Sequence, residues 1–304
     1  MKRRALLKMA LALPIIQSLP PAKATARMAE GQARPPNALS SGLPGLDYAL
    51  EGMTPGFLIG ITGPTCTGKT MLLLELAARL SIRYRQNVAF YSAHKPSVYL
   101  AKKAILRGGA SIRYLEGLSP DDPSAGVSSE AALYLIDANS ADPEGAYETA
   151  VRLRRVHPAG CAAFILDGWS SQPQSPGDDM EFIGGVPYVL SDPWPHSTSI
   201  SPHQISRLRH LVRDRRLPMI FGLTTASLVD DEALSASFGL ESAIRCQSDR
   251  WVVLYRPELY RTTEESRPVE RNLVRLTETS AASPHTRYSE LRYNFSTLSF
   301  ATAT

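Results

Sequence analysis

Cysteines are few in this sequence, and long hydrophobic runs are absent. The three cysteines, Cys66, Cys161 and Cys246, lie far apart in a chain of 304 residues. This spacing excludes a disulfide scaffold and argues against a cysteine-based zinc site. No apolar run reaches about 18 residues, which excludes a polytopic membrane protein. Hydrophobic residues make up 43% and charged residues 20% of the chain, a balance typical of a soluble globular protein with one large domain or two small ones.

The net charge of +4 comes from the first residues of the chain. Residues 1–34 contain seven of the 33 Lys and Arg residues and one of the 29 acidic residues. The remaining 26 basic and 28 acidic residues give residues 35–304 a net charge of −2. The basic excess therefore belongs to an N-terminal leader and not to the body of the chain.

Residues 1–24 have the layout of an export signal. A basic start is followed by the short apolar stretch Met9–Leu19 and by Ala22-Lys23-Ala24, which fits a cleavage site and is too short to span a bilayer. The run Lys2–Lys8 also resembles a twin-arginine signal. The alternative is a basic, amphipathic N-terminus on a cytoplasmic protein. Residues 25–39 are small, polar and proline-containing, as in a linker without packed structure.

From residue 40 onward, short apolar runs alternate with helical stretches. The apolar runs are nearly continuous, as in strands buried on both faces of a mostly parallel sheet. They are Phe57–Thr62, Val88–Tyr91, Leu133–Ile136, Ala163–Leu166, Met219–Leu223 and Trp251–Tyr255. Helices are expected at Thr70–Tyr84, Ser97–Arg107, Pro143–Val156 and His203–Arg216. The alternation predicts an α/β domain with a doubly wound, mostly parallel sheet and helices on both faces.

Two parts of the chain depart from this alternation. Asn272–Leu276 and Ser289–Tyr293 are expected to form a C-terminal antiparallel hairpin at the sheet edge. Ser170–Ser201 is rich in Pro, Gly, Ser and Asp and has no helical period. A loop of this length in a compact domain is usually functional or disordered.

A phosphate-binding loop is the clearest chemical signal in the sequence. Eight consecutive residues fit the pattern G-x-x-x-x-G-K-[ST]: Gly63, Pro64, Thr65, Cys66, Thr67, Gly68, Lys69 and Thr70. The pattern follows an expected strand and opens an expected helix, so loop amides and the helix N-terminus can together cradle an anion. Lys69 is expected to reach the β- and γ-phosphates of a nucleotide, and the Thr70 hydroxyl to bind Mg²⁺. The alternative is a structural loop that has lost its ligand.

Asp167 supplies a candidate second group for the metal. It ends the apolar run Cys161–Leu166, where nucleotide-binding domains place a carboxylate that holds magnesium. An aspartate at the end of a buried strand can instead act as a helix cap or a turn residue. We expect ATP and Mg²⁺ as ligands, with Thr70 and Asp167 on the metal.

With these features in place, the chain resembles the C-terminal, RecA-type motor domain of the DnaB replicative helicases over roughly residues 40–300. The segments that carry the resemblance occur in the family's order: Ser41–Asp47, Gly52–Gly56, Glu148–Arg155, Phe164–Asp167, Ile205–Ile220, Ser248–Arg256 and Glu290–Tyr293. The resemblance implies a RecA-like ATP-binding domain over residues 40–304 that unwinds DNA in replication. It also implies a homo-hexamer that binds single-stranded DNA in the cytoplasm without a membrane partner. The family's helical N-terminal domain has no counterpart in the sequence.

The sequence departs from the family at positions that carry the chemistry. His94 stands where the family has a glutamate that polarises the attacking water; an imidazole can act as a base but cannot supply the carboxylate's negative charge. Thr224 and Thr225 replace a glutamine sensor, and Thr277–Ser280 replace Lys and Arg fingers, with Arg275 the nearby cation. Such fingers contribute roughly 10³–10⁵ in rate. The departures predict a domain that holds nucleotide and hydrolyses it poorly.

The loops that face DNA in this family are acidic here. Residues 170–206 contain Asp178, Asp179, Glu181 and Asp192, and residues 227–240 contain Asp230, Asp231 and Glu232, with no Lys or Arg in either segment. Phosphates of single-stranded DNA bind basic grooves, so we expect weak DNA binding. The arginine-rich stretch His203–Arg216 is interpreted as the solvated face of an amphipathic helix.

Three functions remain open from the sequence. The first is a DnaB-like helicase motor with impaired hydrolysis. The second is a non-enzymatic relative that binds nucleotide and acts as a regulatory or assembly partner. The third is a RecA-fold ATPase of the RadA or KaiC type, which shares the phosphate loop but not this C-terminal tail.

Overall fold

The structure is a computed structural model that describes just over half of the chain. The described residues are 35–64, 67–93, 100, 112–114, 131–137, 142–170, 180–183, 186–189, 200–225, 241–256, 272–279, 287–294 and 299–302. The expected leader at residues 1–24 and most of the expected linker therefore lie outside them, as does nearly all of the expected helix Ser97–Arg107. Within the described part of the chain, no helix is long and apolar enough to cross a membrane.

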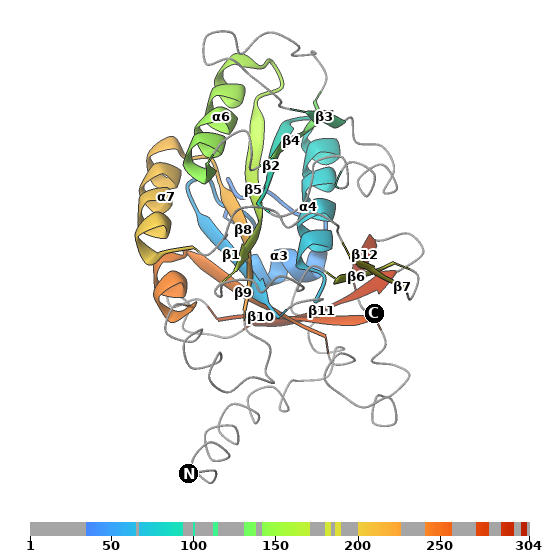
Figure 1. Cartoon of the computed structure of the whole chain (residues 1–304). Coiled ribbons are helices and arrows are strands. Elements are labelled where there is room, and N and C mark those ends of the chain that lie inside the picture. Colours follow the sequence, from blue (N-terminus) through green and yellow to red (C-terminus); the bar gives the residue numbers. More distant parts are fainter. Residues whose placement is uncertain are drawn as a thin grey trace, which may run out of the picture.

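A ten-stranded sheet forms the centre of the molecule, with strand order β12-β11-β10-β9-β1-β8-β5-β2-β4-β3 (Figure 1). The strands from β9 to β3 in this order are parallel to one another. Their bounds are Leu58–Gly63 (β1), Asn87–Ser92 (β2), Ile112–Tyr114 (β3), Leu133–Asp137 (β4), Cys161–Ser170 (β5), Met219–Thr224 (β8) and Arg250–Tyr255 (β9). All six predicted strands are confirmed. The short strand β3 was not predicted.

The C-terminal strands add an antiparallel extension to one edge of this sheet. β10 (Leu273–Glu278) pairs with β9 and with β11 (Arg287–Asn294), which in turn pairs with β12 (Ser299–Thr302). The predicted hairpin is thus confirmed. β12 is an additional strand that the sequence pattern did not predict.

One expectation about loop structure is wrong in part. Within residues 170–201, β6 (Met180–Ile183) and β7 (Val186–Val189) form a separate two-stranded antiparallel sheet. The sequence contained a signal for it, because Gly184-Gly185 separates two runs rich in aromatic and β-branched residues, and such a pair is typical of a tight hairpin.

Helices cover both faces of the large sheet (Figure 1). α3 (Pro44–Leu50) and α4 (Lys69–Tyr84) lie on one face, and α6 (Pro143–Val156) and α7 (Pro202–Arg215) lie on the other. Three of these helices match predicted ones. The seven-residue α3 is too short to show a helical period and was missed. Together the layers confirm the predicted α/β, RecA-like architecture with an antiparallel C-terminal edge.

Local sequence sets where the two helices on the second face begin. The Asp142 side chain accepts a hydrogen bond of 2.6 Å from the backbone N–H of Gly145 and so caps α6. Ser201 and Gln204 form a capping box at the start of α7. Each helix also begins with a proline, whose fixed φ suits the first helical position. These caps satisfy amide groups that have no partner inside the helix.

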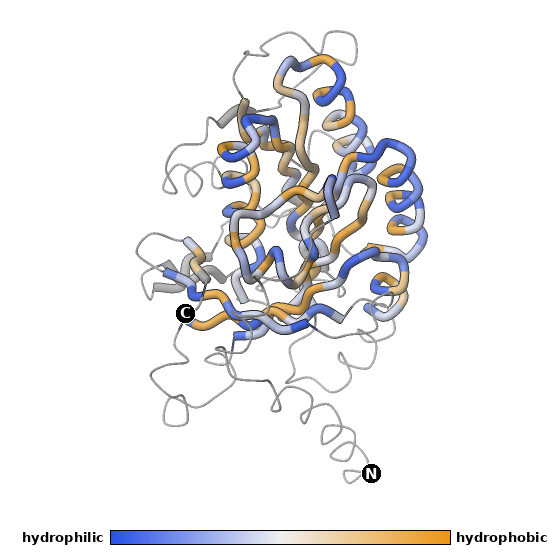
Figure 2. The backbone as a smooth tube through the Cα atoms, turned by 180° about the vertical axis from the view of Figure 1, so that it is seen from behind, coloured by the Kyte–Doolittle hydropathy of each residue, from blue (hydrophilic) through white to orange (hydrophobic). Residues whose placement is uncertain are grey.

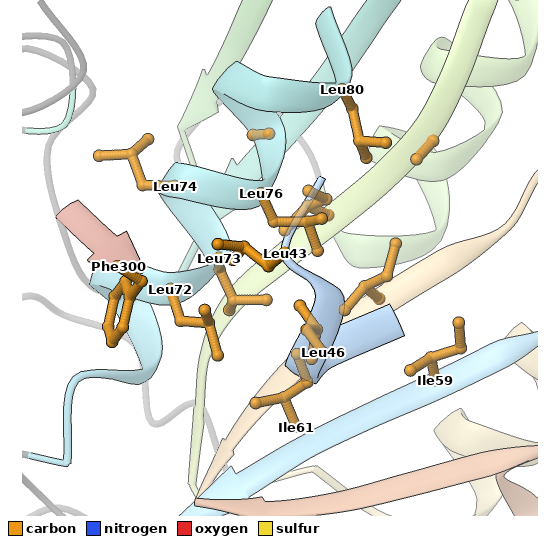
Figure 3. Close-up of a cluster of buried hydrophobic side chains, with 14 of the residues drawn as sticks. Leu43, Leu46, Ile59, Ile61, Leu72, Leu73, Leu74, Leu76, Leu80 and Phe300 are labelled. Carbon is orange, nitrogen blue, oxygen red and sulfur yellow. The ribbon is translucent and has the colours of Figure 1, made fainter. Parts of the chain in front are cut away.

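The hydrophobic core consists of two clusters, one on each face of the sheet. On the α3 and α4 side, leucines of α4 such as Leu73 and Leu76 pack against Leu46 and Ile61, as Figure 3 shows. β1 and β2 are buried along their whole length, which explains why most of their residues are apolar. Figure 2 shows the hydrophobic stretches along the central strands and hydrophilic turns at the outer helices. Each fully buried leucine contributes roughly 1.5–3 kcal/mol.

Candidate functional site

The phosphate-loop pattern lies at the carboxyl end of the central strand β1 and leads directly into α4. Gly63 is the last residue of β1, and Gly68 is the N-cap of α4 with φ 94°, a left-handed conformation that favours glycine. A Cβ on Gly63 would lie 2.6 Å from the carbonyl oxygen of Leu254, closer than such atoms approach. Both glycines of the pattern are therefore required by the local structure. Thr65 and Cys66 lie outside the described residues.

The Lys69 side chain lies within the loop and is only 8% exposed. Its Nζ donates hydrogen bonds of 2.8 Å to the Gly63 carbonyl and 2.7 Å to the Pro64 carbonyl, and it lies 3.5 Å from Thr67 Oγ1. Thr67 Oγ1 donates in turn to the Pro64 carbonyl at 2.9 Å. A buried ammonium group is stable only with acceptors of this kind. The ammonium group of Lys69 thus lies at the N-terminus of α4, where an anion is favoured.

Thr70 occupies the first turn of α4 and is half-buried. Its position beside Lys69 is the one that the pattern predicts for a metal-binding hydroxyl. Within the described chain, no three His, Cys, Asp or Glu side chains gather to hold a metal. A magnesium ion at this place would therefore depend on Thr70, a carboxylate, waters and phosphate oxygens, which is how this cation is commonly bound with nucleotides.

Asp167 is a buried residue inside β5, with 3% exposure. A Cβ on Gly222 of β8 would lie 3.2 Å from Asp167 Oδ1 and 2.8 Å from a methyl carbon of Leu73. The carboxylate therefore lies on the α4 face of the sheet, above β8. The register of β5 against β8 shifts immediately after Leu166, where Gly168 has φ 100°. Asp167 thus lies in a strand, beside an irregularity, and is neither a helix cap nor a turn residue.

The parallel strands bring these positions to the same edge of the sheet. Gly63 is in register with Thr224 at the end of β8, and the backbone N–H of Thr225 donates to the Gly63 carbonyl at 3.1 Å. On the other side of β5, the backbone N–H of Ala93 donates to the Asp167 carbonyl at 2.9 Å. His94 itself lies outside the described residues. The two threonines at the sensor positions are therefore directly beside the start of the phosphate loop.

The segment compared with the family's fingers, Thr277–Ser280, begins at the end of β10, whose last residue is Glu278. Arg275 Nε is 3.1 Å from Glu290 Oε1 on β11, and both side chains are 17% exposed. Glu278 is fully buried, and the backbone N–H of Thr279 donates to the Trp251 carbonyl. Arg275 is thus engaged within its own hairpin. Ser280 lies outside the described residues.

Arginines of α7 contact acidic side chains of neighbouring elements. Arg207 pairs with Glu144 at 2.5 Å and Arg215 with Glu148 at 3.2 Å, both on α6. Two further arginines of α7 lie within 4 Å of Asp249, at 3.1 Å and 3.6 Å. These contacts support the interpretation that the arginines form the solvated face of the amphipathic helix α7. The acidic residues of the two loops are outside the described side chains.

Two buried groups elsewhere on the sheet are held in their neutral form. Burial raises the pKa of the Cys161 thiol to about 12. Burial, with a smaller contribution from Asp142, also raises the pKa of Tyr91 to about 12. Both groups remain protonated at neutral pH, so neither is available as a base or nucleophile.

Comparisons with known proteins agree with this arrangement. Residues 38–114 match the family described as the DnaB-like helicase C-terminal domain. No curated protein gives a significant match. Two solved structures have similar folds. The first is a DnaB-like replicative helicase studied together with its interactions with primase; its TM-score is 0.58 at 16% identity, over 88% of this chain and 62% of that one. The second is an ATPase domain with a TM-score of 0.59 at 15% identity, over 92% of this chain and 96% of that one.

The family match covers the segment from the entry of the domain through β1, the phosphate loop and β2. The structural similarity extends over most of the chain and establishes the fold. This chain spans 62% of the length of the first helicase structure. These findings agree with the resemblance seen in the sequence: residues 38–114 are similar to the DnaB-like helicase C-terminal domain, and the chain as a whole has a RecA-like fold.

Proposed function

We propose that this protein is a DnaB-like motor homologue that binds Mg·ATP at the phosphate loop and hydrolyses it slowly. The observation that carries the proposal is the position of Lys69. Its ammonium group is buried at the N-terminus of α4 and held by the carbonyls of Gly63 and Pro64, within the loop whose amides would surround a phosphate. The Asp167 carboxylate, at the same edge of the sheet, supports a metal site beside it.

The residues of the chain fit the nucleotide in a defined way. Lys69 would exchange its carbonyl partners for the β- and γ-phosphates, which offer a stronger, charged acceptor. Thr70 and Asp167 would hold the magnesium ion. Bound Mg·ATP supplies a reactive phosphoanhydride bond whose charge the metal partly neutralises. The loop backbone from Gly63 to Gly68 would orient the phosphates and exclude water from their inner side.

Slow hydrolysis follows from groups that act on the transition state. His94 stands at the place of the family's glutamate, and a neutral or protonated imidazole there gives no negative charge to orient the attacking water. Arg275 is paired with Glu290 in its own hairpin, so it is not poised to serve a neighbouring subunit. Lys69 and Asp167 act mainly on bound nucleotide. We therefore expect the protein to retain affinity for the nucleotide while its rate of hydrolysis is low.

The activity of a complete helicase is a further step in the proposal. By resemblance, the protein would assemble as a homo-hexamer in the cytoplasm and act on DNA in replication. The acidic residues of segments 170–206 and 227–240 argue for weak affinity for single-stranded DNA, since phosphates are repelled by them.

A second candidate function is that of a non-enzymatic relative that binds nucleotide and serves as a regulatory or assembly partner. The pairing of Arg275 with Glu290 favours it, because it engages a cation close to the finger position and so keeps it from acting in a neighbouring site. Single-turnover hydrolysis, with the protein in excess over Mg·ATP and at a concentration above the dissociation constant, separates the two. Any nucleotide-dependent release of phosphate that disappears with Lys69→Ala supports the slow motor.

Calorimetry with Mg·ATP on the full chain tests the binding proposal. We expect Lys69→Ala to lose most of the affinity, since it removes the side-chain cation from the cradle. Arg207→Ala is a matched control, because it removes a cation that is 59% exposed on α7, on the opposite face of the sheet. Equal affinities for wild type and Lys69→Ala would refute the assignment of this loop as a nucleotide site.

A further inference from the structure

The C-terminal strand β12 lies next to the first turns of α4, although more than 200 residues separate them in sequence. Figure 3 shows the Phe300 side chain of β12 beside Leu72 of α4. Phe300 is only 2% exposed and belongs to the core cluster that includes the leucines of α4. Its ring also packs on Tyr293 of β11, with a centroid distance of 4.9 Å. The end of the chain is therefore part of the support of the helix that follows the phosphate loop.

The tip of the Phe300 ring faces Gly68 of the loop. A Cβ placed on Gly68 would lie 3.6 Å from Phe300 Cζ, and this is the sole contact within 4 Å that such an atom would make with described parts of the chain beyond its immediate neighbours. Gly68 has φ 94° and accepts the first backbone hydrogen bond of α4, from Leu72. Glycine at such a position has wide conformational freedom. The aromatic ring is the side chain that limits this freedom on its side of the loop.

Arg79 holds β12 in this place. Its Nη2 donates to the Phe300 carbonyl at 3.2 Å and its Nη1 to the Gly42 carbonyl at 3.1 Å. Its Nε is 2.6 Å from Oε1 of Glu75, one turn earlier on α4, whose side chain is 6% exposed. A guanidinium fixed by a buried carboxylate keeps its remaining donors in a defined direction. Arg79 thus ties the backbone at Phe300 to the same helix whose N-terminus the ring supports.

We propose that Phe300 is a positioning residue for the phosphate loop and that Arg79 keeps it in place. The ring occupies the space beside Gly68 and so favours the left-handed conformation of this residue before a ligand arrives. A loop held in this way loses less conformational freedom on binding, which increases affinity. The inference rests on the proposed function, because it assigns a role toward the phosphates of a nucleotide.

The test is Phe300→Leu in the full chain, with Phe90→Leu as a matched control. Phe90 is also fully buried and belongs to the same core cluster, but it lies on β2. We expect Phe300→Leu to weaken Mg·ATP binding about tenfold by calorimetry, under conditions where urea unfolding shows that both variants are folded. Phe90→Leu should lower the stability to a similar extent and leave the affinity within about twofold of wild type. Equal affinities of Phe300→Leu and wild type would overturn the proposal, as would equal losses in both variants.

Hydrogen exchange of the nucleotide-free protein gives a readout independent of binding. Amides of residues 67–72 should exchange faster in Phe300→Leu than in Phe90→Leu, while amides of α6 change equally in both. Unchanged exchange of this segment in Phe300→Leu would contradict a positioning role. If the wild type itself fails to bind Mg·ATP, the proposed function is wrong, and exchange alone then decides whether Phe300 orders the loop.

Arg79→Met tests the link through the backbone of β12. The variant keeps an aliphatic stem and removes the donors to Phe300 and Gly42, so we expect weaker Mg·ATP binding and faster exchange at residues 67–72. Arg154→Met is its control, because Arg154 also joins two segments by donating to the carbonyls of Arg215 and Arg216. An equal loss of affinity in both arginine variants would show a general effect on stability and refute the specific link.

Discussion

At the scale of single residues, Gly222 determines where the Asp167 carboxylate can lie. The position faces α4 from β8, and an added Cβ would be 2.8 Å from Leu73 Cδ1 and 3.2 Å from Asp167 Oδ1. Leu73 is fully buried, so it has little room to move away. The missing side chain of Gly222 therefore leaves the space that the carboxylate occupies beside the phosphate loop.

Gly222→Ala should reduce the free energy of unfolding by about 1–3 kcal/mol, because the new methyl group overpacks the core. It should also weaken the magnesium dependence of ATP binding, since Asp167 must move. Urea unfolding and calorimetry with and without Mg²⁺ measure the two effects. In the double variant Gly222→Ala/Leu73→Ala, the clash with Leu73 is removed while the one with Asp167 remains. A single variant with wild-type stability and wild-type magnesium dependence would contradict this account.

At the scale of secondary-structure elements, α6 and α7 form a pair on the face of the sheet opposite α4. Their ion pairs are partly exposed, and pairs of this kind contribute only about 0–1 kcal/mol each. The caps and the buried faces are the stronger contributions. Ile205, Leu208 and Val212 of α7 are buried against the sheet, so the start of α7 must be well defined for these side chains to pack in register.

Ser201→Ala should lower the free energy of unfolding by about 1 kcal/mol, because it removes the acceptor for the backbone N–H of Gln204. Urea unfolding followed by circular dichroism measures the loss. Ser206→Ala is the control: it makes the same chemical change inside the helix and should alter stability by less than about 0.5 kcal/mol. Equal effects at the two serines would show that the capping box does not stabilise α7.

At the scale of the whole molecule, the fold retains the groups proposed to bind a nucleotide more completely than the groups proposed to act in its hydrolysis. The loop, Lys69 and Asp167 meet at one edge of the sheet, whereas Arg275 pairs within its hairpin. A RecA-like motor depends on all of these groups together.

ATP hydrolysis by the purified protein should be slow and should not increase with single-stranded DNA. The physical reasons are the missing carboxylate at position 94, the engaged Arg275 and the acidic loops. Phosphate release with and without an oligonucleotide measures it, at nucleotide concentrations that calorimetry shows to be saturating. His94→Glu should raise the rate, whereas His94→Gln, which adds no negative charge, should not. Rapid hydrolysis that DNA accelerates further would contradict this prediction and indicate an ordinary helicase.

The leader allows a separate prediction about location. A motor that depends on ATP belongs in the cytoplasm, so residues 1–40 fused to a reporter that works only after export should give no signal. An active reporter that is lost on Arg3→Lys/Arg4→Lys would show export by a twin-arginine route and contradict the proposed cytoplasmic location.

Much of the fold and the candidate site was predictable from the sequence because the signals are local. Strands such as β1 and β8 are continuously apolar because helices cover both faces of the sheet at these positions. The phosphate loop can be predicted because its glycines, its lysine and the start of the following helix occur within eight residues. α6 was predicted to the residue, since a capping aspartate and a proline mark its start.

Features that depend on residues far apart in the chain could not be predicted from local patterns. The pairing of Arg275 with Glu290 follows from the register of β10 and β11. The short strand β12 is defined by its pairing with β11, and the Phe300 ring, whose carbonyl accepts from Arg79 of α4, faces Gly68. None of these segments carries a pattern long enough to specify its partner. Local patterns thus specified the residues of the loop and the order of the layers. The packing of β12 against α4 joins segments more than 200 residues apart and exists only after the sheet has formed, so no local pattern predicts it.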